Sequence, residues 1–142
     1  MASVGQAQST QALGRLGEQL AAEHLERRGF RILERNYRTR WGELDIVAFD
    51  GRTLVFCEVK SRRLPSAGAG LRPGPTGRQS VAAAPFDGVH ARKRAQVRKM
   101  AARWFSERAN RPYAPAVRFD AIGVTFDRRG ELVRLDHLEG AF

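Results

Sequence analysis

The chain has 142 residues, 42% of them hydrophobic, and a formal net charge of +10. This size and composition predict a single domain that can bury its own hydrophobic core. No apolar run reaches membrane-spanning length and the first ten residues lack the apolar centre of a signal peptide, so we expect a cytoplasmic protein without a membrane partner. The positive charge favours a polyanionic partner, and on charge alone nucleic acid is the first candidate and an acidic membrane the second.

The hydrophobic pattern predicts an α/β fold, in which a mixed central sheet of about five strands is flanked by two main helices. Residues 1–10 are small and polar and are predicted to be a flexible N-terminus, and residues 11–142 to form the single domain. The expected elements, in chain order, are a helix over 11–28, strands over 30–36, 42–49 and 53–60, a helix over 90–110, and strands over 117–126 and 131–138.

Two further features complete the organisation of the chain. The segment 64–88 is rich in Gly, Pro, Ala and Ser, and we expect a long loop that is disordered unless it orders over a ligand. The single Cys57 excludes an internal disulfide and suits a reducing compartment. Because side chains alternate along a strand, Cys57 should point to the opposite face from Glu58. We expect it to be a small residue of the core.

An acidic pair and a lysine lie on the second and third strands, which the turn signal Asp50-Gly51 joins into a hairpin. Side chains alternate along a strand, so any even loop places Asp45 and Glu58 on one face. A loop of residues 50–51 would set them diagonally, and a loop of residues 51–52 would set them directly opposite each other.

Neighbouring carboxylates repel each other, and a magnesium or manganese ion relieves that repulsion. We therefore expect Asp45 and Glu58 to be metal ligands, with the Val59 carbonyl as a third. Lys60 would orient or help deprotonate the attacking water, or neutralise charge on the phosphate. The alternative is an ordinary surface ion pair between Glu58 and Lys60, with Asp45 facing solvent.

Glu18 is a candidate third acid. It lies on the flank of the first helix among small residues, which would let this helix edge approach the sheet closely enough for Glu18 to reach the same metal. The alternative is a solvated glutamate at the helix edge.

Aromatic and basic residues just before the acidic strand predict contacts with a phosphate backbone or with an unpaired base. The candidate nucleic-acid-binding residues are Tyr37, Arg38, Arg40, Trp41, Arg62 and Lys93. The alternatives are rings packed on the hairpin and solvated cations. Asp120 is expected to pair with an arginine, and the three histidines do not cluster along the sequence, so no zinc site is predicted.

The runs Gly42-Glu43-Leu44-Asp45-Ile46-Val47-Ala48 and Leu54-Val55-Phe56-Cys57-Glu58-Val59-Lys60-Ser61-Arg62 resemble the PD-(D/E)xK nuclease pattern. More narrowly, the chain resembles the bacterial YraN-type proteins, which are related to archaeal Holliday-junction resolvases. The likeness extends to residues 14–18, 35–38, 93 and 118–120. The segment 64–88 is longer than the short connector that is usual in the family.

This resemblance implies a restriction-endonuclease-like core and a magnesium-dependent phosphodiesterase site. In that site Asp45 and Glu58 match the metal ligands, Lys60 the catalytic lysine and Glu18 the acid of the first helix. The resemblance also makes a homodimer possible.

Three functions remain open on the sequence. The leading hypothesis is a metal-dependent endonuclease that hydrolyses DNA phosphodiester bonds, in branched or flapped DNA for example. The alternative is a non-catalytic nucleic-acid-binding module on the same scaffold, and the third is an accessory subunit that docks an acidic protein.

Overall fold

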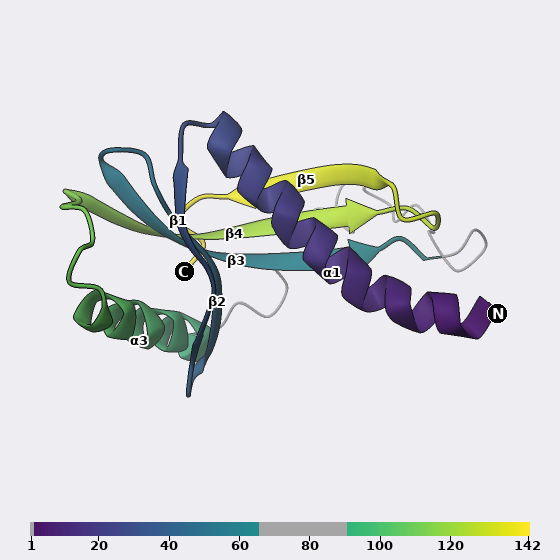
Figure 1. Ribbon diagram of the computed structural model, residues 1–142, viewed down its shortest axis with the longest axis horizontal. Coiled ribbons are helices and arrows are strands. Elements are labelled where there is room, and N and C mark those ends of the chain that lie inside the picture. Colours follow the sequence, from purple (N-terminus) through teal and green to yellow (C-terminus); the bar gives the residue numbers. More distant parts are fainter. Residues whose placement is uncertain (1, 66–90) are drawn as a thin grey trace.

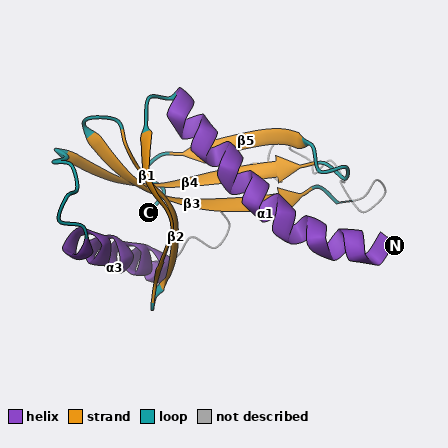
Figure 2. Ribbon diagram, viewed as in Figure 1, coloured by secondary structure: helices purple, strands orange, loops and turns teal. Residues whose placement is uncertain are grey.

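The computed structural model describes residues 2–65 and 91–142, with side chains from Thr10 onward. The predicted loop 64–88 therefore falls almost entirely outside the described residues, as do Met1 and His90. The elements are α1 (Ala2–Arg27), β1 (Arg31–Thr39), β2 (Gly42–Phe49), β3 (Thr53–Arg63), α3 (Ala91–Glu107), β4 (Ala116–Phe126) and β5 (Leu132–Leu138) (Figures 1 and 2).

The described residues form the predicted α/β arrangement of two helices and one mixed sheet. The strand order is β1-β2-β3-β4-β5, and β3 and β4 are the parallel pair in an otherwise antiparallel sheet. In Figure 1, α1 runs obliquely across β3, β4 and β5, and α3 lies at the other end of the sheet beside β2. Neither described helix has both the length and the apolarity needed to cross a membrane.

Helix α1 differs from the prediction at its start. It begins at Ala2 and not at Gln11, so residues predicted as a flexible terminus lie in the helix. The segment contains no proline that would stop the helix. At its other end, Gly29 (φ +91°) closes the helix as predicted, because the Phe30 N–H donates to the Leu25 carbonyl and the Gly29 N–H to the Glu26 carbonyl.

The hairpin between β2 and β3 takes the second of the two registers that the sequence allowed. Phe49 pairs with Leu54 and Ile46 with Cys57, which leaves residues 51–52 as the turn. The Asp50 carboxylate accepts hydrogen bonds from the backbone N–H groups of Arg52 and Thr53, at 2.9 and 2.6 Å, and fixes this turn.

Each face of the sheet carries its own hydrophobic core. The core under α1 contains Leu25, Ile46 and the fully buried Cys57, which confirms the prediction for this cysteine. The core under α3 is built around Phe56, which contacts the rings of Trp104, Phe105 and Phe119.

The sheet opens into a fork between β2 and β3. These strands are paired only over residues 46–49 of β2, whereas β1 and β2 stay paired to Gly42 and β3 and β4 to Arg63. Figure 1 shows β1 and β2 turning away from β3. Asp45 is the first residue of β2 inside this fork, and continuing the register by one step beyond the pair Ile46 and Cys57 sets it against Glu58.

Candidate metal centre in the fork between β2 and β3

Asp45 lies where β2 changes its orientation relative to the sheet. Leu44 packs in the core under α3 and Ile46 in the core under α1, although residues two apart on a strand normally share a face. The register of β1 places Asn36 opposite Asp45, and Asn36 has a φ of 56°. Asparagine tolerates this left-handed conformation better than most residues. The change of orientation at Asp45 on β2 and the unusual backbone of Asn36 on β1 therefore occur at the same point of the sheet.

The carboxylate of Asp45 replaces part of the missing strand pairing, because its Oδ2 accepts a hydrogen bond from the Val59 N–H at 2.7 Å. The N–H and C=O groups of one strand residue point to the same edge of the strand. The Val59 carbonyl therefore also faces the fork, on the side where a metal ligand was predicted.

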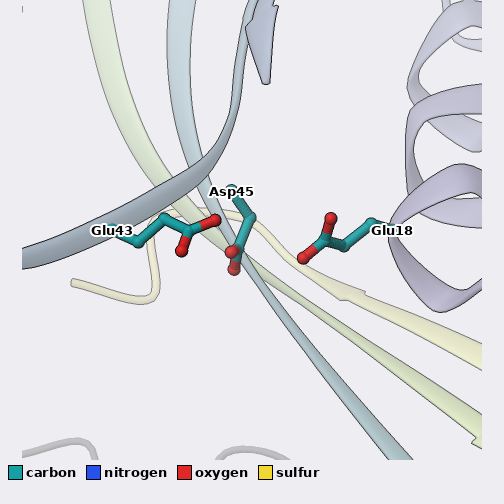
Figure 3. Close-up of side chains that lie close together, drawn as sticks. All are labelled: Glu18, Glu43 and Asp45. Carbon is teal, nitrogen blue, oxygen red and sulfur yellow. The ribbon is translucent and has the colours of Figure 1, made fainter. Parts of the chain in front are cut away.

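Three carboxylates converge at this point. Glu18 of α1 and Glu43 and Asp45 of β2 each offer an oxygen atom, and the three atoms lie within 4.8 Å of one another. Figure 3 shows Glu18 and Glu43 reaching toward Asp45 from opposite sides. With its amide nitrogen directed at this cluster, Asn36 donates to Glu18 Oε2 at 3.0 Å and to Glu43 Oε1 at 2.7 Å.

The concentration of negative charge is unfavourable without a cation. Burial raises the pKa of Asp45 to about 7, and the neighbouring carboxylates add to this effect, whereas the hydrogen bond from Val59 opposes it. Burial and Glu43 also raise the pKa of Glu18. An all-oxygen donor set with excess negative charge suits a hard divalent cation such as Mg²⁺ or Mn²⁺, so the residues present fit the predicted cofactor.

Glu58 lies beside this cluster and not within it. Its side chain is 14% exposed, and its Oε1 is 2.9 Å from Lys93 Nζ and 3.5 Å from Lys60 Nζ. It is nevertheless close enough to contribute to the raised pKa of Asp45. The ion pair between Glu58 and Lys60 that the alternative describes is present, although Glu58 is largely buried, and Asp45 does not face open solvent.

The candidate nucleic-acid-binding residues before β2 are packed around a cavity of about 330 Å³ between the β1–β2 turn and α3. Tyr37 is buried and its hydroxyl donates to Glu107. The guanidinium of Arg40 lies over the Trp41 ring at 4.7 Å, and Arg38 is 3.7 Å from Glu43.

Tyr37 thus takes the packed position that the sequence left as an alternative, while the Arg38 side chain is largely exposed. Lys93 pairs with Glu58. Arg62 carries a buried Nη1 that has no hydrogen-bond partner among the described residues.

Two of the three histidines, which do not cluster along the sequence, meet in the fold. His24 Nε2 lies 3.0 Å from His137 Nδ1, and His137 Nε2 lies 2.7 Å from Asp120 Oδ2. The packing of α1 near the end of β5 brings them together, and nothing local in the sequence indicates that contact. The predicted arginine partner of Asp120 is confirmed as Arg118, with two hydrogen bonds at 2.8 and 2.9 Å.

Sequence reasoning missed two residues of the site, Glu43 and Asn36. Glu43 is two residues from Asp45 on the same predicted strand, so the alternation of side chains could have identified it as a ligand. Asn36 offered a weaker signal, because its role depends on a backbone twist that hydrophobic periodicity does not report.

Comparison with known proteins shows the family to which the chain is similar. A family model described as "Uncharacterised protein family UPF0102" matches residues 17–124, a range that contains the acidic cluster and Lys60. The chain is 46% identical to a UPF0102 protein of Parafrankia sp. (strain EAN1pec), over 94% of this chain and 98% of that protein. It is 48% identical to one of Frankia alni, over 92% and 94%, and 41% identical to one of Acidothermus cellulolyticus, over 97% and 98%.

Proposed function

The chain belongs to the uncharacterised protein family UPF0102, the YraN family that its motifs resemble, and we propose that it is a metal-dependent endonuclease of DNA. The observation that carries this proposal is the convergence of Glu18, Glu43 and Asp45 in the fork, with a lysine pair directly beside them. Mg²⁺ or Mn²⁺ is the proposed cofactor, and DNA in the cytoplasm is the proposed partner.

Some residues of the site would bind the metal ion and others would offset negative charge on the phosphate. The three clustered carboxylates and the Val59 carbonyl would hold the ion, and Glu58, which lies beside them, would be a further ligand. When bound, the ion would lower the pKa of a coordinated water and offset negative charge on the phosphate.

Lys60 is the proposed catalytic lysine. Its side chain is more than half exposed and is held near the fork by Glu58 at 3.5 Å. It would orient the attacking water, accept its proton or stabilise charge on the phosphate. The exposed Arg38 and the guanidinium of Arg62 would contact the flanking phosphates.

The experiment is a cleavage assay with purified protein on linear, nicked, flap and four-way DNA, in Mg²⁺, in Mn²⁺ and in chelator. We expect metal-dependent cutting that Asp45→Asn and Glu58→Gln abolish while DNA binding is retained. The exposed Glu131→Gln makes the same change of charge and should cut normally. Cleavage by Asp45→Asn at the wild-type rate, or equal cleavage in chelator, would contradict the proposal.

One observation favours the second candidate, a nucleic-acid-binding module without catalysis. Glu58 is paired with two lysines and is turned toward them, whereas a ligand would be expected to join the acidic cluster. Calorimetric titration with Mn²⁺ separates the two functions, because only the enzyme needs ion binding that disappears on substitution of Asp45. Binding to bare DNA that falls steeply with salt would count against the third hypothesis, the accessory protein subunit.

A further inference from the structure

A pocket of about 270 Å³ lies between α1 and the end of β3, immediately beside the candidate metal centre. Glu18, which belongs to the acidic cluster, also lines this pocket. Its other walls come from α1 on one side and from β3 on the other, and in Figure 1 this half of α1 passes close to the end of β3. Any group seated in the pocket would therefore lie next to a phosphate bound at the centre.

Two glycines on α1 explain why the pocket exists. At Gly17 the helix touches β3, because a Cβ there would lie 1.9 Å from Ser61 Oγ. One turn earlier, a Cβ on Gly14 would meet nothing within 4 Å. The helix and the strand thus make contact at Gly17 and leave open space at Gly14, where the absence of a side chain keeps the pocket clear.

The pocket has an apolar wall and a basic end. Leu13 and Val59, which pack against the core under α1, supply the apolar surface. Arg62 also lines the pocket, and its buried Nη1 has no hydrogen-bond partner in the part of the chain that the structure describes. A buried donor without an acceptor is unfavourable, and an anionic oxygen would satisfy it.

These features match one nucleotide, whose flat apolar base would lie on Leu13 and Val59 and whose phosphate would meet Arg62. The cavity is slightly smaller than pockets that hold drug-sized ligands, so it has room for one base and not for a base pair. A base that is stacked in a duplex cannot enter such a pocket without leaving the helix, whereas an unpaired base enters freely.

We propose that this pocket receives a single unpaired nucleotide adjacent to the phosphate held at the metal centre. The preferred substrate is therefore DNA with an unpaired residue at the bound position, such as a single strand, a flap or a branch point. This inference deepens the proposed function and rests on it for the identity of the neighbouring phosphate.

The test is to fill the pocket from Gly14 and to measure binding without cleavage. Fluorescence anisotropy in chelator would compare a labelled twelve-nucleotide single strand with the blunt duplex of the same sequence. We expect Gly14→Leu to weaken binding of the single strand about tenfold, the order of magnitude for losing one base contact, and to leave duplex binding unchanged. The matched control, Ala102→Leu on the exposed face of α3, should change neither.

Leucine is a better helix former than glycine, so Gly14→Leu should fold, and its urea unfolding midpoint checks this. Arg62→Met provides a second variant, which removes the basic end without filling the pocket and should also weaken the single strand more than the duplex. Equal binding of the single strand by wild type and both variants, or an equal loss for single strand and duplex, would overturn the proposal.

Because this measurement needs no hydrolysis, it separates the two proposals. A selective loss in a protein that never cleaves DNA would support the pocket and refute the nuclease. Cleavage that depends on Asp45, together with unchanged binding by Gly14→Leu, would do the reverse.

Discussion

Replacing Asp45 by asparagine should stabilise the metal-free protein at high pH, although it should destroy the proposed metal centre. Burial among carboxylates raises the pKa of Asp45 from 3.8 to about 7. The folded protein therefore binds the proton more tightly than the unfolded chain, and folding stability falls as the pH rises from the unfolded value to the folded one. At 1.36 kcal/mol per unit, the full difference above pH 7 is about 4 kcal/mol.

Asparagine is neutral at every pH and retains a side-chain oxygen that can accept from the Val59 N–H, as Asp45 does at 2.7 Å. Asp45→Asn should therefore be more stable than wild type by up to about 4 kcal/mol at pH 8, and by roughly 1–2 kcal/mol at pH 5, where less than half of the difference remains.

The assay is urea unfolding in chelator at both pH values, with Glu131→Gln as a control that removes one exposed charge. The control should show little difference from wild type at either pH. A variant at Asp45 that is less stable than wild type at pH 8, or whose advantage does not shrink toward pH 5, would refute the reasoning.

Mn²⁺ at one hundred times its dissociation constant should stabilise the wild type against urea unfolding by about 2.7 kcal/mol. Glu18→Gln should gain less stability at the same Mn²⁺ concentration, and an equal gain would contradict the assignment of Glu18 as a ligand. Gly17→Ala should lose up to about 2 kcal/mol, because overpacking against the side chain of Ser61 outweighs the gain in helix propensity, whereas Gly14→Ala, in open space, should gain about 1 kcal/mol from helix propensity. Urea unfolding in which both variants are stabilised, or both are destabilised, would contradict this contrast. Phe56→Ala should lose roughly 3–5 kcal/mol in the same assay because the ring is fully buried, and a loss below about 1 kcal/mol would be inconsistent with that packing. Asp120→Ala should lose roughly 3–5 kcal/mol because it leaves Arg118 and His137 without their buried acceptor, which a neutral result in urea unfolding would disprove.

The sequence was sufficient wherever the deciding interaction is local. Alternation along β2 and β3 limits the hairpin to two registers, and one of them is the observed register that sets Asp45 opposite Glu58. Gly29 marks the end of α1 in the same way, through its own backbone conformation. The α/β arrangement also follows from periodicity, because the two helices have distinct apolar stripes and the strands alternate.

The sequence was insufficient where strands separate or where distant elements meet. The fork forms because β2 separates from β3 after only four paired residues. The point at which two strands separate is not visible in the hydrophobic periodicity of the sequence. For this reason the register of the hairpin favours Glu58 over Glu43 as a ligand, whereas the structure groups Glu43 with Asp45. The contact between His24 and His137 spans 113 positions and depends on how α1 crosses the sheet.

The bond from the Val59 N–H to Asp45 makes one carboxylate a substitute for backbone pairing that the separated strands no longer provide. Metal binding should consequently weaken the hydrogen bond of the Val59 N–H, because a carboxylate oxygen that binds a cation is a poorer acceptor for an amide. The rate of hydrogen–deuterium exchange at that single amide would then report whether a metal ion is bound. It could be measured without DNA and without turnover.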